Sequence, residues 1–99
     1  MLTFSFTFLM VATLLAQNRS ITGRITDPAG EPLPGTTVLV KYAGIGTTSD
    51  GTGAYTLVVP EEYDLLVFSF IGYETQEVEI GDRKAFDIQL AEATSALDE

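Results

Sequence analysis

The segment Asp50-Gly51-Thr52-Gly53 is the part of this sequence that comes nearest to a ligand-binding loop. A calcium loop needs several oxygen ligands in register, as in the pattern D-x-D-x-D-G, and here only Asp50 and neighbouring hydroxyls are available. An aspartate at the start of a tight turn commonly accepts hydrogen bonds from the backbone N–H groups that follow it. We therefore interpret Asp50 as a residue of a hairpin turn rather than as a metal ligand.

Two acidic pairs and two glycine pairs also invite a chemical interpretation. Glu77 and Glu79 share one face of a predicted strand, but nothing apolar stands beside them to raise a carboxyl pKa, as a glycosidase acid requires. The glycine pairs at 44/46 and 51/53 precede no helix N-terminus, and no lysine follows them in the order of a phosphate-binding loop. We interpret these residues, together with Glu61-Glu62, as solvated strand faces and turns.

The residue types that are missing narrow the chemistry further. The 99-residue chain has no cysteine, histidine or tryptophan, which excludes a thiolate nucleophile, an imidazole base, a zinc finger and a haem ligand set. Fourteen acidic and five basic side chains give a formal net charge of -9, and such a surface repels nucleic acid and anionic lipid. The sequence therefore predicts no catalytic, cofactor-binding or metal-binding residue, and a protein that is not an enzyme.

Three aromatic residues leave one binding hypothesis open. Phe68, Phe70 and Tyr73 could form a platform on which a sugar ring stacks, but in a small β-domain such residues usually fill the core. We interpret all three as core residues, and the sequence pattern supports this placement least for Tyr73.

The N-terminal residues are predicted to lie outside the folded domain. Residues 1–16 carry no charge, and their apolar run from Leu9 to Leu15 is shorter than the roughly 20 residues that a membrane-spanning helix needs. We expect a secretory signal peptide that is cleaved after Ala16, followed by a domain at 17–90 and a linker tail at 91–99. The alternative is an N-terminal strand, because Phe4, Phe6 and Phe8 alternate with serine and threonine.

Two-fold alternation of apolar and polar residues from Ser20 onward predicts an all-β fold. We expect a seven-stranded antiparallel Greek-key sandwich without disulfides. Leu65–Ile71 is almost wholly apolar and is predicted to be a central strand buried on both faces. Tyr42 is expected to share one strand face with Val38 and Val40. The seven predicted strands include residues 21–25, 36–42, 45–49, 54–59, 65–71, 74–80 and 86–90.

Three ordered blocks of the chain resemble the carboxypeptidase-regulatory-like (transthyretin-like) domain. The resemblance is nearest to the copy at the N-terminus of SusC/RagA-type TonB-dependent outer-membrane transporters of the Bacteroidetes. It implies a seven-stranded sandwich on the periplasmic side, ahead of the TonB box, plug and barrel, with no catalytic residues. The family commonly has Asp-Gly-Asn-Tyr where this chain has Gly53-Ala54-Tyr55. The missing aspartate is a further reason not to expect a metal site in this loop. The blocks are ITGRITDPAGEPLPGTTVLV (21–40), GTTSDGTGAYTLVVP (46–60) and LVFSFIGYETQEVEI (66–80).

The resemblance implies an exported, non-catalytic module of the periplasm or outer membrane, without a membrane span in the mature chain. As part of a nutrient (often glycan) transporter, the module would act by contact with protein partners of the envelope, namely the rest of the transporter and its surface lipoprotein. Two alternatives stay open. One is a regulatory appendage of a metallocarboxypeptidase, and the other is a free-standing carbohydrate-binding module. The oligomeric state is not determined by the sequence.

Overall fold

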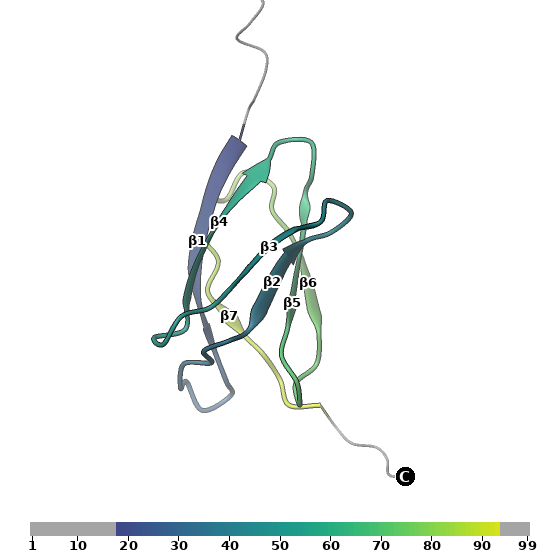
Figure 1. The fold of residues 1–99 in the computed structure, drawn as a ribbon. Helices are drawn as coiled ribbons and strands as arrows, with labels where there is room; N and C mark the ends of the chain where they lie inside the picture. Colours follow the sequence, from purple (N-terminus) through teal and green to yellow (C-terminus); the bar gives the residue numbers. More distant parts are fainter. Residues whose placement is uncertain (1–17, 94–99) are drawn as a thin grey trace, which may run out of the picture.

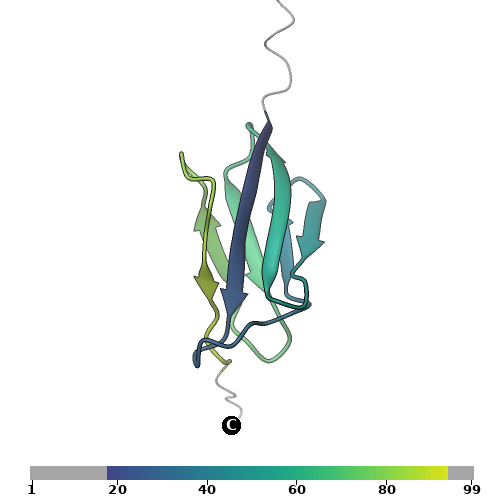
Figure 2. The ribbon, with the colours of Figure 1, turned by 90° about the vertical axis from the view of Figure 1, so that its left-hand side faces the viewer.

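Alternating side chains build two β-sheets that pack face to face in this computed structural model, which describes residues 18–93. One sheet has the strand order β4-β1-β7 and the other β3-β2-β5-β6, as Figure 1 and the turned view in Figure 2 show. The predicted all-β, two-layer architecture with seven strands is confirmed. The strands are β1 (Asn18–Thr26), β2 (Thr37–Val40), β3 (Ile45–Thr48), β4 (Ala54–Pro60), β5 (Leu65–Ser69), β6 (Gln76–Glu79) and β7 (Ile88–Gln89).

The core lies between the two sheets and is filled by the inward residues of each strand. On β4 the side chains of Tyr55, Leu57 and Val59 are buried, whereas Thr56 and Val58 between them are exposed. Tyr55 meets Phe68 of the opposite sheet edge to face, with ring centroids 5.6 Å apart. Within residues 18–93 no helix is long and apolar enough to cross a membrane.

The pairing of β7 corrects the prediction of a wholly antiparallel sandwich. β7 runs parallel to β1, with Ile25 opposite Ile88 and Thr26 opposite Gln89. The other four strand pairs are antiparallel. The physical reason is that the chain reaches β7 from β6 of the other sheet, and a connection between sheets does not impose the reversal that a tight hairpin does. The Greek-key connection stays a prediction.

Two expectations about strand ends were also wrong. β2 ends at Val40, and Tyr42 stands in the β2–β3 turn with φ of 75° and 82% of its surface exposed, not on the inner face. β5 ends at Ser69, so Ile71 lies in the following turn and is 89% exposed. The apolar alternation of β2 continues to Tyr42 and the apolar run of β5 continues to Ile71, but strand pairing ends earlier and the chain turns there.

β5 is central in its sheet, as predicted, but it is fully buried on one face only. Leu66 and Phe68 are buried, while Leu65 and Val67 on the outer face are half-buried. The Lys41 ammonium lies 2.6 Å from Glu77 Oε2, and these residues belong to the two sides of β5. This ion pair therefore crosses over the outer face of β5, which no third layer covers within residues 18–93.

The chain from Lys84 to Ala93, here called the closing segment, joins the two sheets. In the first sheet Phe86 N–H donates to the carbonyl of Thr22 (2.9 Å), and Leu90 N–H donates to the carbonyl of Thr26 (3.0 Å). The segment then crosses to the second sheet, where Glu74 N–H donates to the carbonyl of Ala91 (2.8 Å) and Ala93 N–H to that of Gly72 (2.9 Å). Hydrogen bonding thus continues past Leu90 to Ala93.

A buried contact fixes the middle of the closing segment against β1. The Tyr55 hydroxyl donates to the carbonyl of Phe86 over a distance of 2.9 Å. Gly23 of β1 lies next to this bond and leaves room for it, because it has no side chain. A Cβ added at Gly23 would overlap the Phe86 carbonyl oxygen and lie 2.8 Å from the Tyr55 hydroxyl. Burial, and secondarily the charge of Asp87, raises the pKa of Tyr55, so the phenol stays protonated and keeps its donor.

Gly23→Ala tests this contact. The new methyl group must displace the closing segment or the Tyr55 ring, so we expect the free energy of unfolding to fall by about 2–4 kcal/mol in urea denaturation. Gly51→Ala is the matched control, because a Cβ at Gly51 meets nothing within 4 Å. Similar losses in the two variants would contradict the close approach of Phe86 to Gly23.

Candidate functional site

The Asp50 loop, which came nearest to a ligand-binding motif, is a closed turn between β3 and β4. Asp50 Oδ1 accepts hydrogen bonds from Thr52 N–H (2.8 Å), the Thr52 hydroxyl (2.8 Å) and Ala54 N–H (3.1 Å). The predicted aspartate acceptor is confirmed. The turn is not a hairpin, however, because β3 and β4 belong to different sheets and do not pair with each other. These bonds, the one from the Thr52 hydroxyl first, hold the pKa of Asp50 below its ordinary value.

The acidic pairs lie apart from one another and on the surface. Glu77 is exposed and engaged by Lys41, while the neighbouring Glu79 is exposed on the β6 edge. Glu61 and Glu62 occupy the turn after β4 and are exposed too. Among residues 18–93 no three acidic side chains gather closely enough to hold a metal ion. The structure thus places these carboxylates as solvated charges, as the sequence predicted.

The three aromatic residues divide between core and surface. Phe68 is fully buried, which confirms its place in the core. Phe70 and Tyr73 are half-buried, pack against the core and face each other with ring centroids 5.8 Å apart. A shallow hollow of about 430 Å³ lies beside Phe70 and the exposed Ile71. No sequence pattern indicated this hollow, because Ile71 continues the apolar run of β5.

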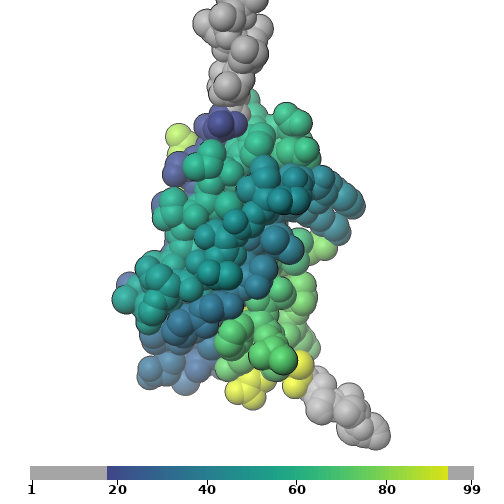
Figure 3. All heavy atoms as spheres, viewed as in Figure 1, coloured from purple at the N-terminus to yellow at the C-terminus, as the bar shows by residue number. Residues whose placement is uncertain are grey.

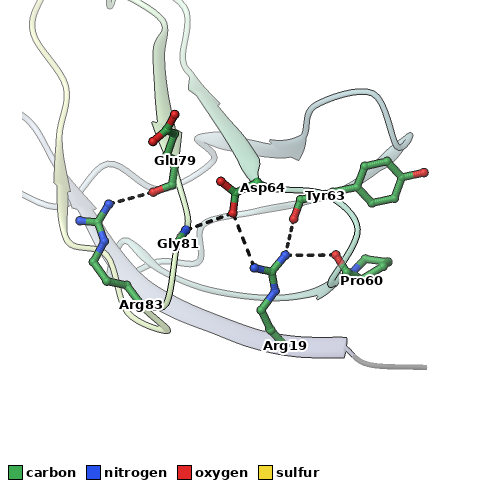
Figure 4. A network of polar contacts seen from close by, with 7 residues as sticks. All are labelled: Arg19, Pro60, Tyr63, Asp64, Glu79, Gly81 and Arg83. Atoms are coloured by element: carbon green, nitrogen blue, oxygen red, sulfur yellow. Dashed lines mark hydrogen bonds and ion pairs between the residues drawn. The ribbon is translucent and has the colours of Figure 1, made fainter. Parts of the chain in front are cut away.

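Sequence reasoning also missed the role of Arg19. Its guanidinium donates to the carbonyls of Pro60 (3.1 Å) and Tyr63, and it lies 3.8 Å from Asp64 Oδ1 (Figure 4). Asp64 Oδ1 also accepts a bond from Gly81 N–H at 3.1 Å. Arg19 therefore holds the start of β1 against the turn that follows β4, and Asp64 connects this turn to the turn that follows β6. Only 15% of its side chain is exposed, and no local pattern marks an arginine for such a position.

Exposed apolar side chains on the β2–β3 side of the molecule form the best candidate contact surface. The β2–β3 turn projects from the right-hand side in Figures 1 and 3 and carries the exposed Tyr42. Leu39 is 43% exposed on the outer face of β2. The Lys41 ammonium lies 5.4 Å from the centroid of the Tyr42 ring. We call Leu39, Lys41, Tyr42 and Glu77 the β2 outer surface. An aromatic ring and a leucine framed by one ion pair suit protein contact better than acid–base chemistry.

Asp50→Asn tests the electrostatic role of the turn. Because the folded-state pKa of Asp50 is depressed, its charge stabilises the fold above the ordinary value of 3.8, and this contribution is lost as pH falls through the lower folded-state pKa. We therefore expect the variant to be less stable than the parent at pH 7. The difference in stability should disappear as the pH falls through the folded-state pKa of Asp50. Thermal unfolding from pH 7 to pH 2 measures it, with Asp82→Asn as a control for net charge; a gap that is independent of pH would contradict the assignment.

Comparison with known proteins gives both a family and longer relatives. Residues 21–99 match the CarboxypepD_reg-like domain family. A TonB-dependent receptor of Formosa agariphila is 40% identical over 95% of this chain and 9% of the receptor. A second receptor of that organism is 34% identical over 97% of the chain and 10% of the receptor. The TonB-dependent receptor SusC of Bacteroides thetaiotaomicron is 36% identical over 85% of the chain and 8% of SusC. The chain thus spans about a tenth of the length of these relatives.

Two solved structures share the fold at low sequence identity. A chain of the type II cohesin–X-dockerin complex from Acetivibrio cellulolyticus superimposes with a TM-score of 0.55 and 13% identity, over 73% of this chain and 56% of that one. The 3-chlorocatechol 1,2-dioxygenase of Rhodococcus opacus gives a TM-score of 0.56 and 9% identity, over 79% of this chain and 60% of that one. At such identities the likeness concerns the fold alone.

The family match includes β2 to β7 and most of β1, and the relatives agree with the resemblance carried by the three sequence blocks. The chain belongs to the CarboxypepD_reg-like domain family, and its relatives include TonB-dependent receptors.

Proposed function

We propose that this chain is the N-terminal, periplasmic domain of a SusC-like TonB-dependent outer-membrane receptor that imports nutrients such as glycans. The observation that carries this proposal is the extent of the similarity. The match to one TonB-dependent receptor takes in 94 of the 99 residues, so it must include most of residues 1–16 as well as the sandwich. Because the relatives are about ten times longer, transport itself belongs to parts of the receptor outside this chain.

Within the receptor, the domain acts by protein contact and not by catalysis. Its carboxylates are solvated or engaged in turns, and its exposed apolar residues are concentrated at a few places, including the β2 outer surface. A protruding aromatic residue beside an exposed leucine is the kind of group that anchors an interface. The partners are the rest of the receptor and its surface lipoprotein.

The observations favour this function over the two alternatives. The relatives are receptors, which counts against a metallocarboxypeptidase appendage. Tyr73, the residue on which a sugar-stacking platform depends, is half-buried against Phe70 and the core. Saturable glycan binding that disappears in Tyr73→Ala would instead support a carbohydrate-binding module.

Export gives the first test of this function. We expect the leader at 1–16 to be removed after Ala16, because its apolar run is followed by a polar segment. N-terminal sequencing of the protein from the periplasmic and membrane fractions should therefore begin at Gln17. Recovery of a cytoplasmic protein that still begins at Met1 would contradict the proposal.

The contact role gives the second test. We expect a photo-crosslinking amino acid at Tyr42 of the full-length receptor to form a crosslinked product with the receptor or its lipoprotein, because this side chain protrudes from the fold. The same group at Thr56, an exposed position on the outer face of the other sheet, is the matched control. Equal labelling at both positions would count against a contact by the β2 outer surface.

A further inference from the structure

The first strand and the closing segment lie side by side and run in the same direction. β1 begins at the end of the domain where the chain enters, and the closing segment leads to Ala93 at the opposite end (Figures 1 and 2). Their register is parallel throughout, from Thr22 opposite Ala85 to Thr26 opposite Gln89. The two ends of the domain are therefore connected through one ladder of hydrogen bonds.

Tension between the two chain ends would load this ladder in a particular way. It pulls β1 toward its beginning and the closing segment toward its end, so the two strands would have to slide past each other. The hydrogen bonds lie across the direction of pulling and are all loaded together, rather than one after another. These bonds join Thr22 to Lys84 (3.0 Å) and to Phe86 (2.9 Å), and Thr26 to Leu90 (3.0 Å).

Side chains add further resistance to such sliding. Asp87 Oδ1 accepts a hydrogen bond from Arg24 N–H at 3.2 Å, so at this position of the ladder a side chain, not the backbone, supplies the acceptor. The backbone carbonyl of Phe86 does not take this place, because it turns inward and accepts the hydrogen bond from the Tyr55 hydroxyl of β4. The closing segment is thereby held by two strands of the first sheet.

Both ends of the ladder are anchored as well. At the entry end Arg19 binds the carbonyls of Pro60 and Tyr63, which keeps the start of β1 from peeling away. At the exit end Ala91 and Ala93 are hydrogen-bonded to the β5–β6 turn at Glu74 and Gly72. Strain applied to the exiting chain therefore reaches both sheets at once.

We propose that this domain is a tension-bearing link, which stays folded when the chain is pulled from its two ends and opens readily when the same ladder is pulled from one end. This mechanical function goes beyond the contact role and does not depend on it. It is a property of strand direction, because the same bonds resist strongly when sheared together and weakly when broken in sequence.

Single-molecule pulling in two geometries tests the proposal. In the first geometry, handles are attached at Gln17, where the mature chain is expected to begin, and at the C-terminal end. In the second, the N-terminal handle is moved to Ala29→Cys, in the exposed turn after β1, so that the ladder opens from its exit end. The chain has no native cysteine, so this attachment point is unique.

We expect the force at which half the molecules unfold to be at least about twofold higher in the end-to-end geometry, because forced unfolding is governed by the barrier along the pulling direction. Equal thermal unfolding midpoints for the parent chain and Ala29→Cys would show that direction, not stability, causes the difference. Equal forces in the two geometries, or a higher force from Ala29, would overturn the proposal.

A pair of variants identifies the ladder as the element that bears the load. Asp87→Ala removes the acceptor for Arg24 N–H, whereas Gln89→Ala truncates the next outward side chain of the same segment. Under constant end-to-end force we expect Asp87→Ala to unfold severalfold faster than the parent chain and Gln89→Ala to match it. Equal lifetimes for the two variants would overturn the assignment of the load to this ladder.

Discussion

The approach of the Phe86 carbonyl to Gly23 is the constraint on which most of this structure depends. A buried carbonyl must find a donor, and the Tyr55 hydroxyl supplies it from the neighbouring strand. The two groups can meet only because Gly23, between them, has no side chain. This contact places the closing segment in the first sheet, and the same segment then crosses to the second. One short run of backbone is thus hydrogen-bonded to both layers.

The fold is held without a covalent cross-link. The chain has no cysteine, and its core consists of apolar residues from both sheets that meet in pairs such as Tyr55 and Phe68. Hydrogen bonds of the closing segment join the layers at the exit end, and Arg19 joins β1 to the connection between β4 and β5 at the entry end. Polar groups therefore fix the ends of the sandwich, while apolar packing fills its middle.

The surface agrees with a module that works within a longer protein. The chain belongs to the CarboxypepD_reg-like family, and the TonB-dependent receptors to which it is similar are about ten times its length. The acidic side chains of Glu77 and Glu79 on the edge strand β6 disfavour uncontrolled pairing at that sheet edge. In the proposed function, contact is made by the few exposed apolar groups, and the proposed mechanical role uses the strand arrangement between the chain ends. Both roles need geometry and charge, and neither needs a nucleophile.

The sequence alone determined the features that depend on neighbours along the chain. Alternation identified the inward faces of β4 and of the closing segment, and the spacing of Asp50 and Gly53 predicted a turn closed by its own carboxylate. The parallel direction of β7, the exposure of Tyr42 and the position of Arg19 were decided by tertiary structure. Each of these depends on which distant segments meet, and a local period of two residues carries no information about the direction or the length of the partner strand.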